Sequence, residues 1–211
     1  MSDSKKLRSV QAVLFDMDGV LIESSKAWYH TLNLILEKHR LPKISWNVFL
    51  KHLGQSIEKD VETFFKMLTV EQLKQLYIEH FLRFIDLIDP MPGARNVLKK
   101  INRFGLKTGC VTNTPKTLAL KILKNFELLD FLGVVICGDE VSLQKPHPEP
   151  ILRALSTLRV SPEKACFVGD TIYDIEAANR AGCIPIGLKV ESDIKINSLR
   201  ELIHLLGLKS L

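Results

Sequence analysis

The sequence lacks the features that would indicate a membrane protein or a nucleic-acid-binding protein. No apolar run in its 211 residues approaches the roughly 20 that a membrane-spanning helix needs. The net charge of +5 comes from scattered lysines and arginines, without a basic block or a basic stretch interleaved with aromatics. The polar residues 1–10 precede no signal-peptide core. We therefore expect a cytoplasmic protein that binds no membrane or nucleic acid. Its positive net charge produces an electrostatic field that favours small anionic substrates.

Cysteine is also scarce, and its spacing excludes the usual metal and redox motifs. The four cysteines, Cys110, Cys137, Cys166 and Cys183, form no Cys-x-x-Cys pair and have no paired histidine. Three of them lie in apolar, strand-like runs, where a free cysteine behaves as a small hydrophobic residue. We expect buried, reduced thiols.

The hydrophobic pattern predicts an α/β fold. Short apolar runs alternate with segments of helical period, which indicates a parallel sheet covered on both faces. The expected strands are 12–15, 107–112, 134–137, 165–168 and 184–188. The expected helices between and after them are 94–104, 116–126, 149–158 and 172–181.

Residues 24–89 interrupt this alternation. They contain no clear strand, and their apolar residues recur at helical spacing, as in Trp28, Leu32 and Leu36. The stiff Pro-Met-Pro-Gly stretch at 90–93 is typical of a boundary. We therefore predict a core made of residues 1–23 and 90–211, with a helical bundle at 24–89 inserted after the first strand.

The most informative motif is Asp16-Met17-Asp18-Gly19, at the end of the first expected strand. Two aspartates at i and i+2 can project to the same side of an extended chain, and Gly19 permits a sharp turn. Two buried like charges require a metal ion, a cation or a proton. An ordinary turn is the alternative, but ligand sites in open α/β sheets lie at the carboxyl ends of strands.

Three further polar clusters follow later strands. Thr112-Asn113-Thr114 opens a helix and is either a phosphate site or a plain helix cap. Lys145 precedes a proline-rich stretch that would hold it in place, although a lone lysine is usually a surface charge. Asp170 and Asp174 offer the hard oxygen ligands that Mg²⁺ prefers, and Asp174 could instead complement a helix N-terminus.

Taken together and in this order, the four clusters resemble those of the haloacid dehalogenase superfamily. The match is to the subgroup with a helical cap between the first and second motifs, typified by phosphoglycolate phosphatases, pyrophosphatases and β-phosphoglucomutase. This resemblance covers nearly the whole chain. It implies a Rossmann-like core and identifies residues 24–89 as a cap domain.

The resemblance also implies a role for each motif residue. Asp16 would be the nucleophile that forms an aspartyl-phosphate, and Asp18 would protonate the leaving group and then activate water. Thr112 and Asn113 would hold the phosphoryl oxygens, and Lys145 would neutralise the nucleophile and the phosphate. The implied Mg²⁺ ligands are Asp16, the backbone carbonyl of Asp18, and Asp170, with Asp174 in or near the metal shell.

Two parts of the insert complete the resemblance. The loop Leu53-Gly54-Gln55-Ser56 resembles the substrate-contacting loop of the family, so Gly54, Gln55 and Ser56, or His52, would contact the leaving group; a simple inter-helix turn is the alternative. The family usually has Asp-Ser where this chain has Glu23-Ser24. Glutamate is a poorer helix cap, so we expect Ser24 or Ser25 to cap the helix that follows.

The expected activity is Mg²⁺-dependent hydrolysis of a small phosphate monoester, similar to phosphoglycolate or a sugar phosphate. A phosphomutase of the β-phosphoglucomutase type and a pyrophosphatase are the alternatives. A non-catalytic binding protein is disfavoured, because it would be expected to have lost at least one of Asp16, Asp18, Lys145 or Asp170. The oligomeric state, monomer or homodimer, stays open.

Overall fold

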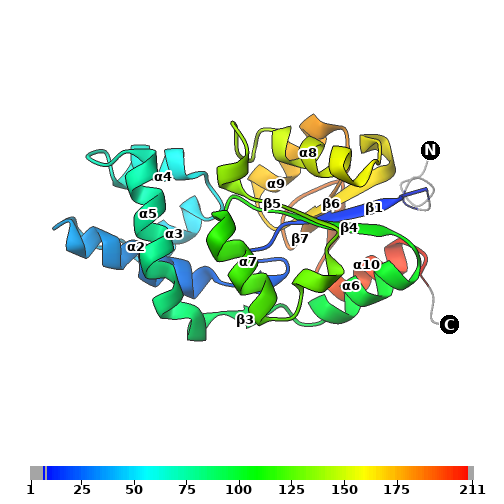
Figure 1. The fold of residues 1–211 in the computed structure, drawn as a ribbon, viewed down its shortest axis with the longest axis horizontal. Helices are drawn as coiled ribbons and strands as arrows, with labels where there is room; N and C mark the ends of the chain where they lie inside the picture. The colour runs from blue at the N-terminus through cyan, green and yellow to red at the C-terminus, as the bar shows by residue number, and fades with distance from the viewer. Residues whose placement is uncertain (1–6, 8, 209–211) are drawn as a thin grey trace.

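The computed structural model describes residue 7 and residues 9–208 as an α/β core beside a helical bundle (Figure 1). The core is a six-stranded parallel sheet with the order β5-β4-β1-β6-β7-β8. Its strands are β1 (Ala12–Phe15), β4 (Lys107–Val111), β5 (Val134–Ile136), β6 (Ala165–Gly169), β7 (Ile184–Leu188) and β8 (Ile194–Ile196). The central strand β1 pairs with β4 on one side and β6 on the other.

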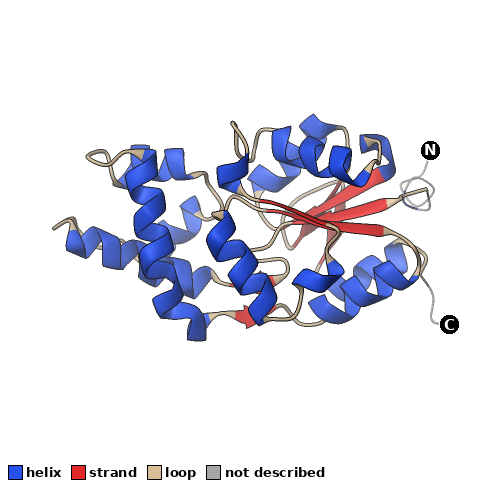
Figure 2. Ribbon diagram, viewed as in Figure 1, coloured by secondary structure: helices blue, strands red, loops and turns tan. Residues whose placement is uncertain are grey.

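Helices cover both faces of this sheet, as expected for a parallel sheet (Figure 2). Successive side chains of β1 alternate: Val13 and Phe15 belong to one apolar cluster, whereas Ala12 and Leu14 belong to another. On the first face lie α6 (Ala94–Arg103), α7 (Lys116–Asn125) and α10 (Leu199–Leu205). On the second lie α8 (Glu149–Leu158) and α9 (Ile172–Ala181). Short 3₁₀ turns are η2 (Leu129–Phe131), η3 (Gly138–Glu140) and η4 (Pro162–Lys164).

The predicted fold class and the five predicted strands are confirmed, but the C-terminal end of the core was missed. The strand β8 extends the sheet beyond β7, and α10 packs beside α6. β8 has only three residues, with the exposed Lys195 between its two isoleucines, so it carries no continuous apolar run. All four cysteines are free and buried, as predicted.

The segment between β1 and α6 forms a helical bundle with its own apolar cluster. Its helices are α2 (Ser25–Lys38), α3 (Trp46–His52), α4 (Ile57–Phe64), α5 (Val70–Phe81) and the 3₁₀ segment η1 (Leu82–Leu87). Leu32, Ile35, Phe65 and Leu73 are buried at its centre. None of the helices in the described part of the chain is long and apolar enough to cross a membrane. We refer to residues 24–89 as the insert.

The two connections between insert and core are joined to each other. Strands β2 (Ile22–Glu23) and β3 (Asp89–Pro90) form a short antiparallel ribbon, in which Glu23 lies opposite Asp89. The chain therefore leaves the core and returns to it at neighbouring points. This ribbon was not predicted, because two-residue strands leave no periodic signal in a sequence.

Candidate active site

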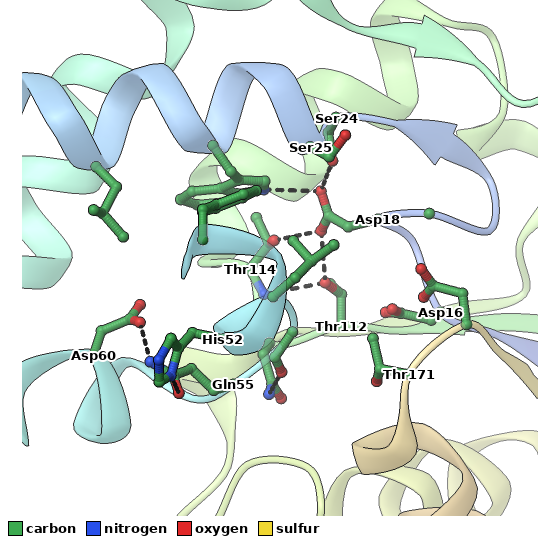
Figure 3. Close-up of a pocket in the computed structure, with 18 of the residues that line it drawn as sticks. Asp16, Asp18, Ser24, Ser25, His52, Gln55, Asp60, Thr112, Thr114 and Thr171 are labelled. Atoms are coloured by element: carbon green, nitrogen blue, oxygen red, sulfur yellow. Dashed lines mark hydrogen bonds between the residues drawn. The ribbon is translucent and has the colours of Figure 1, made fainter. Parts of the chain in front are cut away.

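The sequence motifs converge at the carboxyl edge of the sheet, where they line one pocket with residues of the insert (Figure 3). Asp16 follows β1, Thr112 follows β4, and Asp170 follows β6. Because these three strands are adjacent and parallel, their carboxyl ends lie together. Lys145 reaches the same place from the loop after β5. The cavity has a volume of about 260 Å³.

Lys145 is a buried cation at the core end of this pocket, the end formed by residues that follow the strands of the sheet. Its side chain is 3% exposed, and its Nζ donates to Asp16 Oδ1 at 2.7 Å, to Asp174 Oδ1 at 2.7 Å and to the Val111 carbonyl at 3.0 Å. All three ammonium hydrogens therefore have an acceptor. Burial opposes the charge, but the two carboxylates outweigh it and raise the pKa of Lys145 above its ordinary value. The lysine stays a cation.

The acids around Lys145 outnumber it, so they do not all ionise readily. Burial, only partly offset by Lys145, raises the pKa of Asp16 to about 8, and the nearby Asp174 and Asp18 add to the shift. Burial also raises the pKa of Asp170 well above its ordinary value, again with a contribution from Asp174. A site with this excess of carboxyl groups is suited to a further cation.

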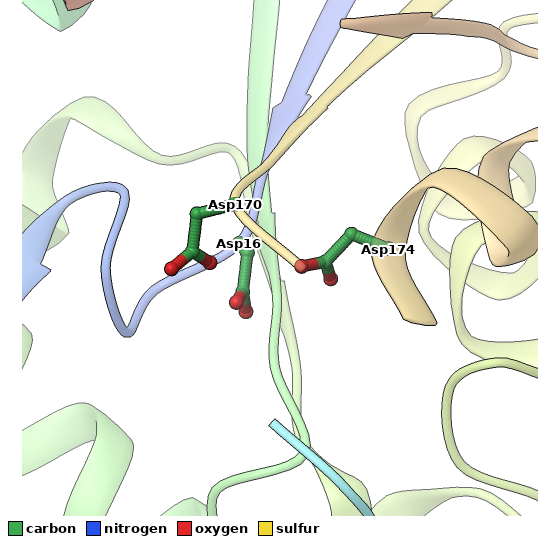
Figure 4. A group of neighbouring side chains, drawn as sticks. All are labelled: Asp16, Asp170 and Asp174. Atoms are coloured by element: carbon green, nitrogen blue, oxygen red, sulfur yellow. The ribbon is translucent and has the colours of Figure 1, made fainter. Parts of the chain in front are cut away.

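Three carboxyl groups offer a place for that cation (Figure 4). Asp16, Asp170 and Asp174 each have an oxygen within 4.8 Å of the others. Asp170 Oδ1 is buried and has no hydrogen-bond partner among the described residues. A buried carboxylate oxygen without a donor is costly, and a hard cation such as Mg²⁺ would satisfy it. The donor set therefore fits Mg²⁺.

Asp174 differs from the other two acids, because both of its oxygens are already occupied. Oδ1 accepts from Lys145, while Oδ2 accepts from the backbone N–H and the hydroxyl of Thr171, at 3.0 and 2.6 Å. In return, Thr171 Oγ1 accepts from the Asp174 N–H, which completes a capping box at the start of α9. The competing role expected for Asp174 at a helix N-terminus is thus present in the structure.

Gly19 lets the chain pass Asp170 closely. Its φ is +76°, and a Cβ on it would lie 2.0 Å from Asp170 Oδ2. No other residue fits there without moving the carboxylate. The glycine after the Asp-x-Asp motif is therefore required by the position of a third aspartate that lies 151 residues later in the sequence.

Asp18 lies in the same pocket but has no lysine beside it. Its Oδ1 accepts from the hydroxyl of Ser24 and from Trp28 Nε1, the latter at 2.9 Å. Its Oδ2 accepts from Thr114 Oγ1 at 2.7 Å and from Thr112 Oγ1 at 3.5 Å. Two donors thus come from the insert and two from the loop after β4, so the position of this carboxylate depends on both parts of the chain.

The expected side-chain cap by Ser24 or Ser25 is not formed. Ser24 is the N-cap residue of α2, but its side chain donates to Asp18 and makes no capping bond. Glu23 Oε1 instead accepts from the N–H of Ser25 at 3.1 Å and from its hydroxyl. The longer side chain of Glu23 therefore accepts from a backbone N–H at the start of the helix. Ser24 does not have to cap the helix, and its hydroxyl donates to Asp18 instead.

Asn113 joins three segments around the pocket. Its side chain exchanges hydrogen bonds with the backbone of Lys145, accepting from the N–H at 3.0 Å and donating to the carbonyl at 3.1 Å. It also donates to the Gly54 carbonyl of the insert at 3.3 Å. The side chain expected to hold phosphoryl oxygens thus fixes the position of Lys145.

Two of the three insert-loop residues lie where they were expected. Gly54 and Gln55 line the pocket; Gly54 has a φ of +84°, and a Cβ on it would lie 2.8 Å from Thr171 Cγ2. Ser56 does not line the pocket: it caps α4, accepting from the N–H of Lys59 at 3.4 Å. His52 lines the pocket as well, with its Nδ1 3.2 Å from Gln55 Oε1.

Sequence reasoning missed three further residues of this pocket. Trp28 was considered only as an apolar residue at helical spacing and Tyr77 had no site role, yet both line the pocket, with ring centroids 5.2 Å apart. Asp60 received no assignment, because one acid on a short helix gives no signal. Tyr77 donates to Asp60 Oδ2 at 2.7 Å, a contact between α4 and α5 that only the folded insert creates.

Comparison with known proteins places this geometry in a family. The model of the haloacid dehalogenase-like hydrolases matches residues 13–187. The chain belongs to that family. It is therefore an enzyme of the hydrolase class, as the resemblance in the sequence implied.

Its relatives include two bacterial proteins named phosphoglycolate phosphatase. The one from Aquifex aeolicus is 31% identical over 190 residues, which cover 90% of this chain and 89% of the relative. The one from Salmonella choleraesuis is 28% identical over 239 aligned positions, covering 96% and 95%. Among solved structures, β-phosphoglucomutase from Clostridium difficile has a TM-score of 0.80 with 21% identity, over 92% of this chain and 93% of the other. This last likeness shows a shared fold.

Proposed function

We propose that this protein is a Mg²⁺-dependent phosphatase that hydrolyses a small phosphate monoester through an aspartyl-phosphate on Asp16. The observation that carries the proposal is the buried Asp16–Lys145 pair beside Asp170, whose Oδ1 has no partner among the described residues. Relatives at about a third identity or less, over nearly the full chain, are named phosphoglycolate phosphatases, which supports the reaction class.

Asp16 is the proposed nucleophile. It is 7% exposed, and Lys145 holds its Oδ1 in one orientation, so the carboxylate is positioned before the substrate arrives. Attack on phosphorus by this carboxylate forms the acyl phosphate and expels the alcohol. Lys145 offsets the negative charge of both the nucleophile and the incoming phosphate.

Asp18 is the proposed general acid and base. It lies between the core and the insert, held by Ser24, Trp28 and Thr114. From there its carboxyl group gives a proton to the leaving alcohol oxygen and later takes one from the water that attacks the acyl phosphate. The donors around it keep the carboxylate at one place for both steps.

Asp16, Asp170 and the backbone carbonyl of Asp18 are the proposed ligands of Mg²⁺. The metal would neutralise phosphoryl oxygens that the acidic cluster alone would repel. Asp174 acts through Lys145, whose ammonium group it shares with Asp16. Thr112 and the backbone of the loop after β4 would contact the phosphoryl oxygens, while Asn113 holds Lys145.

We also propose that residues 24–89 form a cap domain over the pocket. The insert contributes Trp28, Gln55, Asp60 and Tyr77 to the lining, and its Gly54 carbonyl accepts a hydrogen bond from Asn113 of the core. The leaving group therefore lies between the two parts of the chain. Its contacts come mainly from the insert.

A phosphate-release screen tests this function. Purified protein with Mg²⁺ is incubated with small phosphate monoesters and with pyrophosphate, and free phosphate is measured. Release that needs Mg²⁺ and is lost in Asp16→Asn supports the proposal. No release from any ester would overturn it, as would interconversion of sugar phosphates without release, which would identify a phosphomutase.

A further inference from the structure

The insert side of the pocket contains a carboxyl group that the proposed chemistry does not use. Asp60, on α4, lies on the side of the pocket away from Asp16, next to Gln55 and His52 (Figure 3). Its two oxygens accept from Gln55 Nε2 at 2.6 Å and from the Tyr77 hydroxyl at 2.7 Å. These partners come from different segments of the insert, so the group is held in place.

The partners of Asp60 are neutral, in contrast to those of Asp16. Tyr77 has a single O–H, which it already donates to Asp60, and Gln55 gives one of its two N–H groups to the same carboxyl. The oxygens of Asp60 keep further lone pairs, so a ligand that reaches them must supply hydrogen-bond donors.

Among the described residues, the insert side of the pocket offers an anionic leaving group no lysine or arginine, and His52 is its one basic side chain. Lys145 is the one lysine among the described residues that line the whole pocket, and none of them is an arginine. The ammonium hydrogens of Lys145 are all used by Asp16, Asp174 and Val111. Above its raised pKa of about 7, Asp60 carries a negative charge, so a carboxylate on the leaving group would face a like charge with no lysine or arginine beside it, and juxtaposed like charges are strongly unfavourable.

Several residues beside the Asp60 network, on the insert side of the pocket, are apolar or aromatic. They are Trp28, Leu32, Phe49 and Ile57. The cavity of about 260 Å³ is just below the range of roughly 300–1,000 Å³ that is common for small-molecule sites. A small molecule with C–H faces and hydroxyl groups suits this side of the pocket, since the ring faces contact carbon and Asp60 accepts from hydroxyls.

We propose that Asp60, Gln55 and Tyr77 form a specificity site that selects phosphate esters of uncharged, hydroxyl-bearing leaving groups, of the sugar or polyol type, over esters whose leaving group carries a carboxylate. This inference rests on the proposed phosphatase function. It assigns phosphoglycolate, the substrate in the names of the relatives, to the disfavoured class.

Matched pairs of substrates test the proposal. Glycerol 3-phosphate and 3-phosphoglycerate differ by a hydroxymethyl group in place of a carboxylate, as do sorbitol 6-phosphate and 6-phosphogluconate. With Mg²⁺ present and at a pH above the Asp60 pKa of about 7, we expect kcat/KM to be at least about tenfold higher for the polyol member of each pair. A ratio near or below one in the native protein would overturn the inference.

The variant Asp60→Asn assigns the selectivity to this residue. It removes the charge at nearly constant shape, and we expect the ratio to fall to about threefold or less, through a gain for the carboxylate member. The matched control Asp86→Asn removes an exposed acid of the same insert and should leave the ratio unchanged. An unchanged ratio in Asp60→Asn would contradict the proposal. If that variant does not fold, Asp60→Ser, which also removes the charge, replaces it.

A further substrate separates failure of this inference from failure of the proposed function. p-Nitrophenyl phosphate has a good leaving group that depends little on the insert contacts. Hydrolysis of this ester together with equal turnover of both members of each pair would overturn the specificity site alone. No hydrolysis of p-nitrophenyl phosphate or of any pair member would overturn the phosphatase function itself.

Discussion

Each end of the pocket holds a carboxyl group with a raised pKa, buried Asp16 at one end and partly buried Asp60 at the other, and the two are stabilised in different ways. Burial raises the pKa of Asp16 to about 8 and that of Asp60 to about 7. Asp16 has Lys145 beside it, whereas Asp60 has only Gln55 and Tyr77. At the core end the compensation is ionic, and at the insert end it consists of neutral hydrogen bonds.

We infer from this difference that the core end carries out the proposed reaction and that the insert end recognises the leaving group. In the proposed reaction, a phosphoryl group would bring negative charge to the core end, where Lys145 and the proposed Mg²⁺ would meet it. The leaving group would extend toward the insert end, where no lysine or arginine is present among the described lining residues. Variants at the core end should therefore affect catalysis and stability strongly, while variants at the insert end should mainly affect the choice of substrate.

The largest effect is expected for Asp16→Asn. An amide is a poor nucleophile, so kcat should fall by at least about 10⁴-fold, comparable to the loss of a nucleophile in other enzymes. Phosphate release under saturating Mg²⁺ measures it, and Asp86→Asn should keep full activity. Substantial residual turnover would show that another residue attacks phosphorus and would remove the chemical distinction between the two ends.

Lys145→Met should lower both stability and activity. The change leaves Asp16 and Asp174 buried without their cation, which is expected to reduce the free energy of unfolding by about 3 kcal/mol and kcat by about 10³-fold. Urea unfolding followed by circular dichroism gives the stability. The control Lys116→Met breaks the surface pair with Glu140 and should have a much smaller effect. Similar losses in the two variants would argue against ionic compensation in the core.

Mg²⁺ affinity should depend on pH at the core end. Because the pKa values of Asp16 and Asp170 are raised, both groups hold protons at lower pH, and the metal must displace them. Affinity should therefore rise with pH, by about tenfold or more between about pH 6.5 and 8.5. Isothermal titration calorimetry in buffers of different ionisation enthalpy measures the affinity and the released protons. Binding independent of pH, without proton release, would contradict the shifted pKa values.

Trp28→Phe should give the smallest change, at the boundary between the two ends. The ring remains to pack on Tyr77 and Phe81, but the indole N–H that donates to Asp18 is lost. Loss of one hydrogen bond should lower kcat by about three- to tenfold. The Mg²⁺ concentration needed for half-maximal activity should not change. Steady-state kinetics at varied Mg²⁺ separates the two, and a shift in metal dependence alone would show that Trp28 does not act through Asp18.

The core end could be predicted from the sequence because its residues sit at fixed places in a repeating architecture. Apolar runs mark β1 and β6, the shorter apolar pair Cys110-Val111 marks the end of β4, and the polar residue after each strand lies at the same edge of a parallel sheet. Asp16, Thr112 and Asp170 were found in this way. The prediction for Lys145 had less support, because a residue in a loop shows no periodic pattern. Only the need of the clustered acids for a cation favoured it.

The insert end could not be predicted to the same depth. The helical spacing of its apolar residues identified its helices. That spacing shows which face of each helix is apolar, but it does not show which helices contact one another. The contact between Asp60 and Tyr77 joins residues 17 apart on different helices, and the Trp28–Asp18 bond joins the insert to the core. Ser24 shows the same limit: a serine before a helix usually caps it, and here the neighbouring Glu23 left it free for another role.

The ribbon formed by β2 and β3 makes the molecule modular. Glu23 and Asp89 face each other across it, so the insert leaves the core and returns to it at the same place. We therefore expect that a bundle of different length or shape, inserted between these two residues, would leave β1 and the strands beside it in place. Such an exchange would have to keep a serine and an indole donor at the start of the new bundle, because Ser24 and Trp28 hold Asp18 of the core in place.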